Sequence, residues 1–284
     1  MSANQGAVVV GIDGSPDGER GLDWAIAEAA GRGLPLHVVH TLPPLVGDVP
    51  LTADEYREGS AEGDRLLAEA GRRAAASGVA PVSTEFADRS PMPVLVDASR
   101  GAAALVVGAR GHGPLFGLLL GSVSGHVAAH AHCPVVVVRE AADRTARRIV
   151  VGVDGSAGGD EALAFAVERA ARTGTPLVAV HAWRDRDSAH GIGGPDWSRT
   201  VERIDAGNHL LDEALARWRD KYPEVEMTRE AVPVHPARAL ADASGGAALL
   251  VVGARGHGGF AELLLGSVVR SVLHHARCPV VVVH

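Results

Sequence analysis

A glycine-rich segment that occurs twice is the feature of this sequence that most constrains its fold. Residues 106–123 read VVGARGHGPLFGLLLGSV, and residues 251–268 read VVGARGHGGFAELLLGSV. In each copy an apolar run precedes a glycine loop and a Gly-Ser step, which is typical of a strand, a loop and a helix N-terminus. Glycines let backbone N–H groups approach a phosphate, and a helix N-terminus adds free amides and a favourable dipole. Because both copies keep the same spacing, we favour phosphate binding over the alternative that the glycines only form tight turns.

The repeat extends along the whole chain. The segment VVVGIDGS at 8–15 recurs as IVVGVDGS at 149–156, and a polar stretch at 141–148 separates two apolar runs. A chain of 284 residues is long enough for two domains of ordinary size. We therefore expect a first domain over residues 1–141 and a second over residues 147–284.

Each half alternates apolar strands with helices, which indicates a parallel sheet covered on both sides. The prediction is an α/β fold of two tandem doubly wound (Rossmann-like) domains, each a five-stranded mostly parallel sheet with helices on both faces. In such sheets ligands bind beyond the carboxyl ends of the strands, where the strand order reverses. If the first and fourth strands flank that point, Asp13 and the loop from Gly108 converge. In the first half we expect strands at 7–13, 36–41, 82–86, 104–107 and 134–138, and helices at 17–31, 53–76, from 91 and at 122–131.

Charge and composition exclude several classes of function. A net charge of -7 argues against nucleic acid as a partner, because phosphate contacts need a basic face. Lys221 is the only lysine, so no Gly-Lys-Ser/Thr step of a Walker loop exists. The N-terminus runs straight into a strand without a signal peptide, and no apolar run reaches the length of a membrane span. We expect a cytoplasmic protein without a membrane partner.

The combination of GIDGS, the G-x2-G-x9-G-S loop and the closing CPVVVV resembles the universal stress protein family, in both halves. The resemblance implies a tandem bacterial member of the type that binds ATP, with or without Mg, with one nucleotide per half. It also implies pairing through the last strand, which here could join the two halves within one chain. A further homodimer and an unidentified protein partner are separate expectations. The nucleotide-binding residues that we expect are Gly11, Asp13, Val39, Gly108, Ala109, Arg110, Gly111, His112, Gly113, Gly121, Ser122 and Val123 in the first half, and Gly152, Asp154, Val180, Asp185, Gly253, Ala254, Arg255, Gly256, His257, Gly258, Gly266, Ser267 and Val268 in the second.

Several of these residues have alternative interpretations. The aspartates at 13 and 154 are read as adenine and ribose contacts, as N-caps of the next helix, or as catalytic bases, the last being the least favoured. The histidines at 112 and 257 either donate to a phosphate when protonated or face solvent. Asp185 is a possible ribose contact confined to the second half. The arginines at 110 and 255 are candidates for neutralising phosphate charge.

Three further groups of histidine and cysteine residues are candidates for a chemical role. The cluster His126, His130, His132 and Cys133 has helical spacing for a metal, but the second half does not repeat it, and we favour a structural role. Cys133 and Cys278 precede matching terminal strands and are interpreted as structural. His40 and His181 end the second strand of each half and are expected near the nucleotide base or bonded to a backbone carbonyl.

Two hypotheses about function follow. The first is an ATP-binding stress-response protein that acts as a nucleotide-dependent sensor or regulator, with no catalytic residues and no resident metal site. The alternative is a slow ATPase or nucleotide-dependent phosphotransferase that uses the same loops. The second hypothesis requires Asp13 and Asp154 to act as bases, because no other acids recur near the site.

Overall fold

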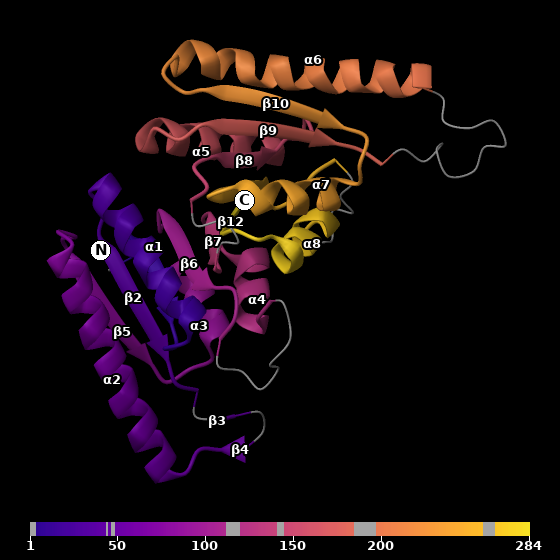
Figure 1. Cartoon of the computed structure of the whole chain (residues 1–284). Coiled ribbons are helices and arrows are strands. Elements are labelled where there is room, and N and C mark those ends of the chain that lie inside the picture. The colour runs from indigo at the N-terminus through magenta and orange to yellow at the C-terminus, as the bar shows by residue number, and fades with distance from the viewer. Residues whose placement is uncertain are drawn as a thin grey trace. The chain divides into compact units, whose positions relative to one another are not determined.

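A computed structural model describes residues 4–43, 45–46, 49–111, 120–140, 145–184, 197–257 and 265–284 of the chain. The chain divides into two compact units, Met1–Glu140 and Ala141–His284 (Figure 1). Each unit alternates strands and helices along the sequence, so each is described separately.

The first unit is built on a parallel sheet with strand order β7-β6-β1-β2-β5. Residues 42–50, expected as a loop, include a two-residue antiparallel pairing of β3 with β4. The elements are β1 (Val8–Ile12), α1 (Pro16–Arg32), β2 (Leu36–Thr41), β3 (Leu45–Val46), β4 (Val49–Pro50), α2 (Ala53–Ala76), β5 (Val82–Ala87), α3 (Pro91–Ala98), β6 (Ala104–Gly108), α4 (Ser122–His130) and β7 (Val135–Val138).

The second unit repeats this arrangement with strand order β12-β11-β8-β9-β10, again all parallel. A short 3₁₀ helix follows its third α-helix. The elements are β8 (Ile149–Gly152), α5 (Ala157–Thr173), β9 (Leu177–Ala182), α6 (Trp197–Lys221), β10 (Met227–Val232), α7 (Pro236–Ala243), η2 (Ser244–Gly246), β11 (Leu249–Gly253), α8 (Ser267–His275) and β12 (Val280–Val283).

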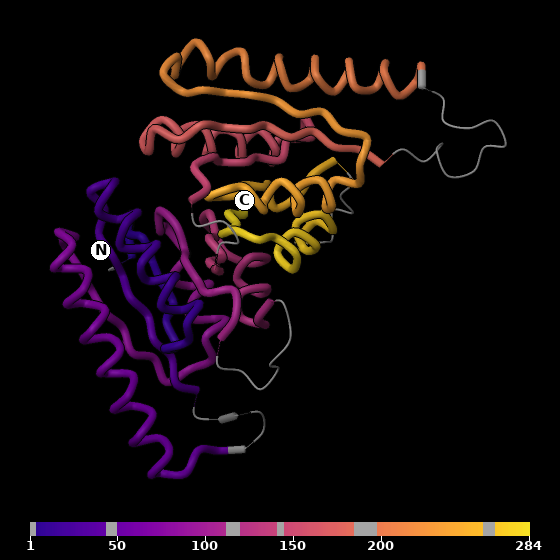
Figure 2. Tube along the Cα trace, in the orientation of Figure 1, coloured from indigo at the N-terminus to yellow at the C-terminus, as the bar shows by residue number. Residues whose placement is uncertain are grey.

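Helices cover both faces of each sheet. Crossovers between parallel strands are right-handed as a rule, and for this strand order the rule assigns α1 and α2 to one face of the first sheet and α3 and α4 to the other. Figure 2 traces the course of the chain. Arg73 of α2 joins the first pair by ion pairs to Glu19 and Asp23 of α1. In each unit the other two helices pack against each other, α3 on α4 and α7 on α8. The α/β, doubly wound fold class predicted from the sequence is confirmed.

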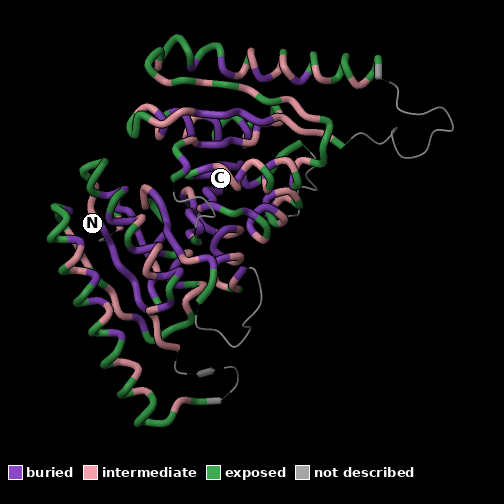
Figure 3. The backbone as a smooth tube through the Cα atoms, in the orientation of Figure 1, coloured by how far each residue is buried: buried purple, intermediate pink, exposed green. Residues whose placement is uncertain are grey.

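The central strands form the core because they are apolar on both faces. Val9 of β1 and Val106 of β6 are fully buried, as are Val150 and Val251 at the matching places of the second unit. In Figure 3 the inner strands are drawn as buried, whereas the outer sides of the helices are exposed. Runs of valine suit such strands, since the β-branched side chain packs well on a pleated surface.

The strand order places the ends of β1 and β6 side by side. The chain leaves β1 towards β2, and it returns on the other side of β1 to form β6, with Val8 paired to both Leu36 and Ala104. This is the reversal of strand order at which doubly wound sheets bind ligands. The same reversal lies between β8 and β11. The assumed strand order therefore holds in both units.

Candidate nucleotide-binding site

The turn after β1 brings a carboxylate against the start of α1. Asp13 Oδ1 accepts hydrogen bonds from the Ser15 N–H at 3.0 Å and from the Ser15 hydroxyl at 2.6 Å. The hydroxyl oxygen in turn accepts the Gly18 N–H at 3.1 Å, so Ser15 is the N-cap of α1. Gly14 has a φ of 79°, in the left-handed region that favours glycine. The turn thus fixes Asp13 beside the helix N-terminus.

The second unit repeats the turn. Asp154 Oδ1 accepts from the Ser156 N–H at 3.0 Å and from its hydroxyl at 2.5 Å, and Ser156 caps α5 through the Gly159 N–H at 3.1 Å. Gly155 has a φ of 81°. The interpretation of the aspartates as N-caps is therefore wrong, because the glycine turn advances the chain and leaves a serine at the cap in both units.

Asp154 is an ionised acceptor at neutral pH. Burial raises its pKa, but hydrogen bonds from Ser156 and from the His257 backbone outweigh burial, so the net pKa lies below its ordinary value. The His257 N–H donates to Asp154 Oδ2 at 3.1 Å. One carboxylate oxygen therefore holds the turn, and the other holds the glycine loop.

The glycine loops lie directly on the aspartates. A Cβ on Gly111 would overlap Asp13 Oδ2, and a Cβ on Gly256 would overlap Asp154 Oδ2. These two glycines are required for close approach of the loop to the carboxylate. In both units the structure thus brings together the predicted aspartate and the predicted loop.

Four other predicted glycines lie against helices. A Cβ on Gly108 would lie 2.6 Å from the carbonyl carbon of Asp17, and one on Gly253 would overlap the Gly158 oxygen. The remaining two, Gly11 and Gly152, face leucine side chains of α3 and α7, and a Cβ on either glycine would lie only 3.0 Å from a leucine methyl carbon. Packing of helix on strand is enough to explain glycine at these four positions.

Helices α4 and α8 begin without a side-chain cap. Their N-caps, Gly121 and Gly266, offer no hydrogen-bonding side chain, and none of the described residues supplies one. Uncapped first-turn amides and the positive end of a helix dipole are the features that suit a helix N-terminus to an anion. The first two helical residues, of which the serines are exposed and the valines half-buried, are Ser122 and Val123 in α4 and Ser267 and Val268 in α8.

A buried alanine in each loop connects strand, loop and helix. The Ala109 N–H donates to the Val138 carbonyl at 2.7 Å, and the Ala109 carbonyl accepts the Gly121 N–H at 2.8 Å. Ala254 makes the equivalent pair of bonds in the second unit. These contacts hold each loop against the N-terminus of the following helix.

The two loop arginines differ in their partners. Arg110 Nε donates to Asp17 Oδ2 at 3.0 Å, and Arg20 donates to the other oxygen of the same carboxylate at 2.8 Å. Asp17 is 3% exposed. Its counterpart in the second unit is Gly158, and Arg255 is exposed and forms no ion pair with any described residue.

A histidine lies under the long helix at the end of the second strand. The His40 Nδ1 is 2.9 Å from the Ile12 carbonyl, and the His181 Nδ1 is 2.8 Å from the Val153 carbonyl. Since a carbonyl can only accept, Nδ1 carries the proton in both rings. The carbonyl-bonded alternative for these histidines is thus the one observed.

The two valines of the second strands that we expected to bind nucleotide, Val39 and Val180, are buried. Val39 pairs with Gly11, and the Val180 carbonyl accepts the Val153 N–H at 2.9 Å. The sheet ladder therefore already uses this carbonyl, which leaves only its second lone pair for a ligand.

Sequence reasoning missed two leucines of the long helices. Leu66 of α2 and Leu210 of α6 lie 3.3 and 3.4 Å from the places that a Cβ would take on Gly14 and Gly155. They add an apolar side to each aspartate turn.

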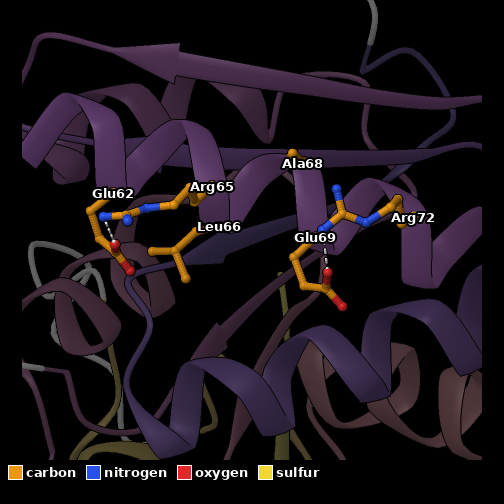
Figure 4. A pocket seen from close by; sticks show the side chains of 6 residues that line it. All are labelled: Glu62, Arg65, Leu66, Ala68, Glu69 and Arg72. Carbon is orange, nitrogen blue, oxygen red and sulfur yellow. Dashed lines mark hydrogen bonds and ion pairs between the residues drawn. The ribbon is translucent and has the colours of Figure 1, made fainter.

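Leu66 also borders a surface hollow along α2. Figure 4 shows its lining, which comes from this one helix and includes the ion pairs Glu62–Arg65 and Glu69–Arg72. Such exposed pairs contribute little to stability. Because the charges are paired and no second element contributes, we do not assign a ligand to this hollow.

Four predicted site residues, His112, Gly113, Asp185 and Gly258, lie outside the described residues. Of the histidine cluster, His126 and His130 stack with ring centroids 4.1 Å apart, and burial together with His130 lowers the pKa of His126. Among the described residues, no group of three or more acidic, histidine or cysteine side chains is placed to hold a metal ion. Cys133 and Cys278 are buried free thiols.

None of the described helices combines the length and the apolar character needed to span a membrane. Fold and site together define a class: a tandem α/β protein with an aspartate turn, a glycine loop and an open helix N-terminus in each unit.

Comparison with known proteins gives the family. The model of the universal stress protein family matches residues 6–139 and again residues 145–284, so the chain belongs to this family as a tandem member. The universal stress protein Rv2623 of Mycobacterium tuberculosis is 38% identical over 97% of this chain and 95% of its own length.

Solved structures agree on the fold. A universal stress protein from Archaeoglobus fulgidus superposes with a TM-score of 0.72 at 22% identity, covering 98% of this chain and 96% of its own. Two structures that each cover about half of this chain are described as complexes: a universal stress protein with cAMP (32% identity, 49% of this chain, 99% of its own, TM-score 0.39) and one from Archaeoglobus fulgidus with dAMP (29%, 48%, 99%, TM-score 0.37).

Proposed function

We propose that the chain is an ATP-binding sensor or regulator with one nucleotide site in each of its two domains, expected at residues 1–141 and 147–284. The observation that carries the proposal is the repeated convergence of Asp13 with Gly111, and of Asp154 with Gly256, beside a helix that begins without a side-chain cap. A phosphate chain fits the open amides and dipole of such a helix. The ionised carboxylate is an acceptor for ribose hydroxyls or the adenine amine.

The residues present suit the nucleotide better than a resident metal. In the first unit the loop and helix offer backbone amides, the Ser122 hydroxyl and the Arg110 guanidinium, all of them donors to phosphate. Magnesium would arrive with the nucleotide and keep most of its water ligands. We therefore propose ATP, with or without magnesium, as the ligand of both units.

The contacts of the aspartates do not favour the enzyme alternative. One oxygen of Asp13 and one of Asp154 already accept two hydrogen bonds from the following serine. A general base must be within hydrogen-bond reach of the proton that it removes. Carboxylates that hold a turn in this way are better suited to binding than to turnover.

The first test is to count nucleotides in the purified protein. Released ligand is identified and quantified per chain by chromatography, and empty protein is titrated with ATP by calorimetry. We expect about two adenine nucleotides per chain, consistent with the repeated site. Mostly ADP in the released fraction would favour hydrolysis, and a chain that binds no adenine nucleotide would refute the proposal.

Two substitutions assign the sites. Ser122→Glu and Ser267→Glu each place a carboxylate in the first turn of α4 or α8. The charge suits the helix dipole and contributes about 0.3–1 kcal/mol to folding, but it repels phosphate. Each variant is expected to keep its thermal stability and to lose one of the two nucleotides, which separates a binding defect from a folding defect.

Homodimer formation, a cytoplasmic location and a protein partner complete the proposal. A sensor transmits its state only through a surface that another protein reads. Gel filtration with light scattering, with and without ATP, measures whether the oligomeric state depends on the nucleotide.

A further inference from the structure

The buried carboxylate of Asp17 is the feature that distinguishes the two proposed phosphate sites. It lies in the first turn of α1 and receives Arg110 Nε at 3.0 Å and the Arg20 guanidinium at 2.8 Å. Asp17 is 3% exposed, whereas Arg110 is 60% exposed. The interaction therefore holds the loop arginine against a fixed negative charge.

Arg110 lies beside the N-terminus of α4, where the proposed phosphate would bind. Its Cα lies 3.8 Å from the place that a Cβ would take on Gly121, the N-cap of α4. Arg255 lies at the same 3.8 Å from the corresponding place on Gly266, the N-cap of α8. Both arginines thus flank an open helix N-terminus.

The backbone around the carboxylate is repeated, but the carboxylate itself is not. Gly108 packs on the backbone of Asp17, and Gly253 packs on the backbone of Gly158 in the same manner. A Cβ on Gly158 would lie only 2.7 Å from the Arg255 carbonyl, so this position leaves no room for an aspartate without a backbone shift. No described residue forms an ion pair with Arg255.

We propose that Asp17 sets the phosphate selectivity of the first site by competing with the ligand for Arg110. The affinity of the first site for adenine nucleotides then depends little on the number of phosphates. The second site, in which Arg255 is available, binds the triphosphate more tightly. This inference rests on the proposed nucleotide function and deepens it. The chain thereby carries one general adenylate site and one site selective for ATP.

The physical reason is the charge that each site presents. Asp17 offsets the charge of Arg110, while Arg20, its other partner, also has the Glu140 carboxylate at 3.9 Å, so adding phosphates to the ligand gains little attraction from Arg110. A free guanidinium makes charge-assisted, often bidentate bonds to phosphate oxygens. One such bond corresponds to about a ten-fold change in affinity.

The test compares ATP with AMP at each site in the full-length chain. Ser267→Glu leaves the first site open, and Ser122→Glu leaves the second. Calorimetry on each gives the ratio of the AMP to the ATP dissociation constant. We expect this ratio to be about ten-fold larger for the second site.

Substitution of Asp17 then tests whether this carboxylate causes the difference in selectivity between the two sites. In the Ser267→Glu background, Asp17→Asn is expected to tighten ATP by about ten-fold and to change AMP by less than about two-fold. The same change in the Ser122→Glu background is expected to alter neither ligand. Asp97→Asn is the matched control, because it removes one negative charge of the same unit from an exposed pair with Arg100.

A second pair of variants covers the case in which Asp17→Asn unfolds. Arg255→Gln is expected to weaken ATP at the second site about ten-fold, and Arg110→Gln to weaken it at the first by less than about two-fold. Equal ratios at the two sites, equal losses in the arginine variants, or weaker ATP binding in Asp17→Asn would each overturn the inference and leave the nucleotide function standing. Failure of the wild-type chain to bind either nucleotide would instead remove the proposed function.

Discussion

The two units share a backbone framework and differ in the side chains attached to it. Each has an Asp-Gly-Ser turn, a glycine loop on the aspartate and a glycine N-cap. Around this framework, Asp17 and Ser124 of the first unit are replaced by Gly158 and Val269 in the second. The difference teaches that glycine spacing preserves the geometry of a site, while neighbouring polar residues determine its charge.

A second exchange shows how packing tolerates such divergence. In the first unit His40 lies 5.8 Å from the Phe86 ring, and in the second His181 lies 5.7 Å from the Trp183 ring. Phe86 belongs to β5, whereas Trp183 follows the end of β9, and Ala231 of β10 takes the place of Phe86 beside the histidine. One large side chain per histidine is kept, as volume-conserving swaps in a core require.

The largest expected effect comes from substitutions in the framework that the two units share. Gly111→Ala and Gly256→Ala each force a Cβ into an aspartate oxygen, and overpacking of this kind costs about 1–3 kcal/mol. Each variant is expected to lose nucleotide affinity in its own unit only, as measured by calorimetry. Gly31→Ala is the control, since its Cβ meets nothing within 4 Å. Loss of both sites from one substitution would show that the units are not independent.

Acid dependence is the next effect in size. The folded pKa of Asp154 is lowered, so its contribution to stability is present above the unfolded pKa and is lost as pH falls through the folded pKa, below about pH 4. Asp154→Asn is expected to cost about 1–2 kcal/mol at pH 7, and this cost should shrink between pH 5 and pH 3. Urea unfolding at several pH values measures it. A cost independent of pH would contradict the assignment, and Asp13→Asn shows whether the first unit behaves alike.

A smaller effect is expected from a difference between the N-terminal turns of α4 and α8. The buried Ser124 hydroxyl donates to the Gly108 carbonyl at 2.6 Å, a bond that Val269 cannot make. Ser124→Ala is expected to destabilise the first unit by about 1 kcal/mol. Thermal unfolding followed by circular dichroism measures the change. An unchanged melting temperature would mean that water replaces the hydroxyl.

The smallest effect concerns a feature that the units have in common. Burial raises the pKa of the Cys133 thiol to about 12, so almost no reactive thiolate exists at pH 8. Iodoacetamide is expected to leave Cys133 unlabelled in the folded protein and to label it rapidly in urea, as peptide mass spectrometry would show. Equal labelling rates in both conditions would refute the structural interpretation of this cysteine.

Much of the fold could be predicted from the sequence because the pattern is strong and repeated. The strand at 36–41 and the helix at 53–76 have the expected bounds. The first strand ends at Ile12 and not at Asp13, because the Asp13 side chain already belongs to the turn. The apolar runs and the glycines between them are local features of the sequence, and they suffice to predict where the strands and helices lie.

The candidate site was less accessible to such reasoning. Asp17 and Arg110 are 93 residues apart, so nothing local connects them. Whether the Val180 carbonyl is free depends on the sheet ladder, and the placement of Leu66 depends on how α2 rotates on the sheet. The nucleotide itself stays a prediction, which the counting experiment decides.

The central position of β1 has a consequence for synthesis on the ribosome. Within the first unit, β1 is synthesised before the other strands. β2 can pair with one of its edges soon afterwards, but the other edge must wait for β6, roughly 70 residues after β2. At about 5–20 residues per second, the nascent chain spends several seconds with that edge unpaired. The loop that meets Asp13 follows β6, so a ligand cannot assist the early steps. Under the proposed function, nucleotide uptake by the first unit would therefore follow completion of the domain.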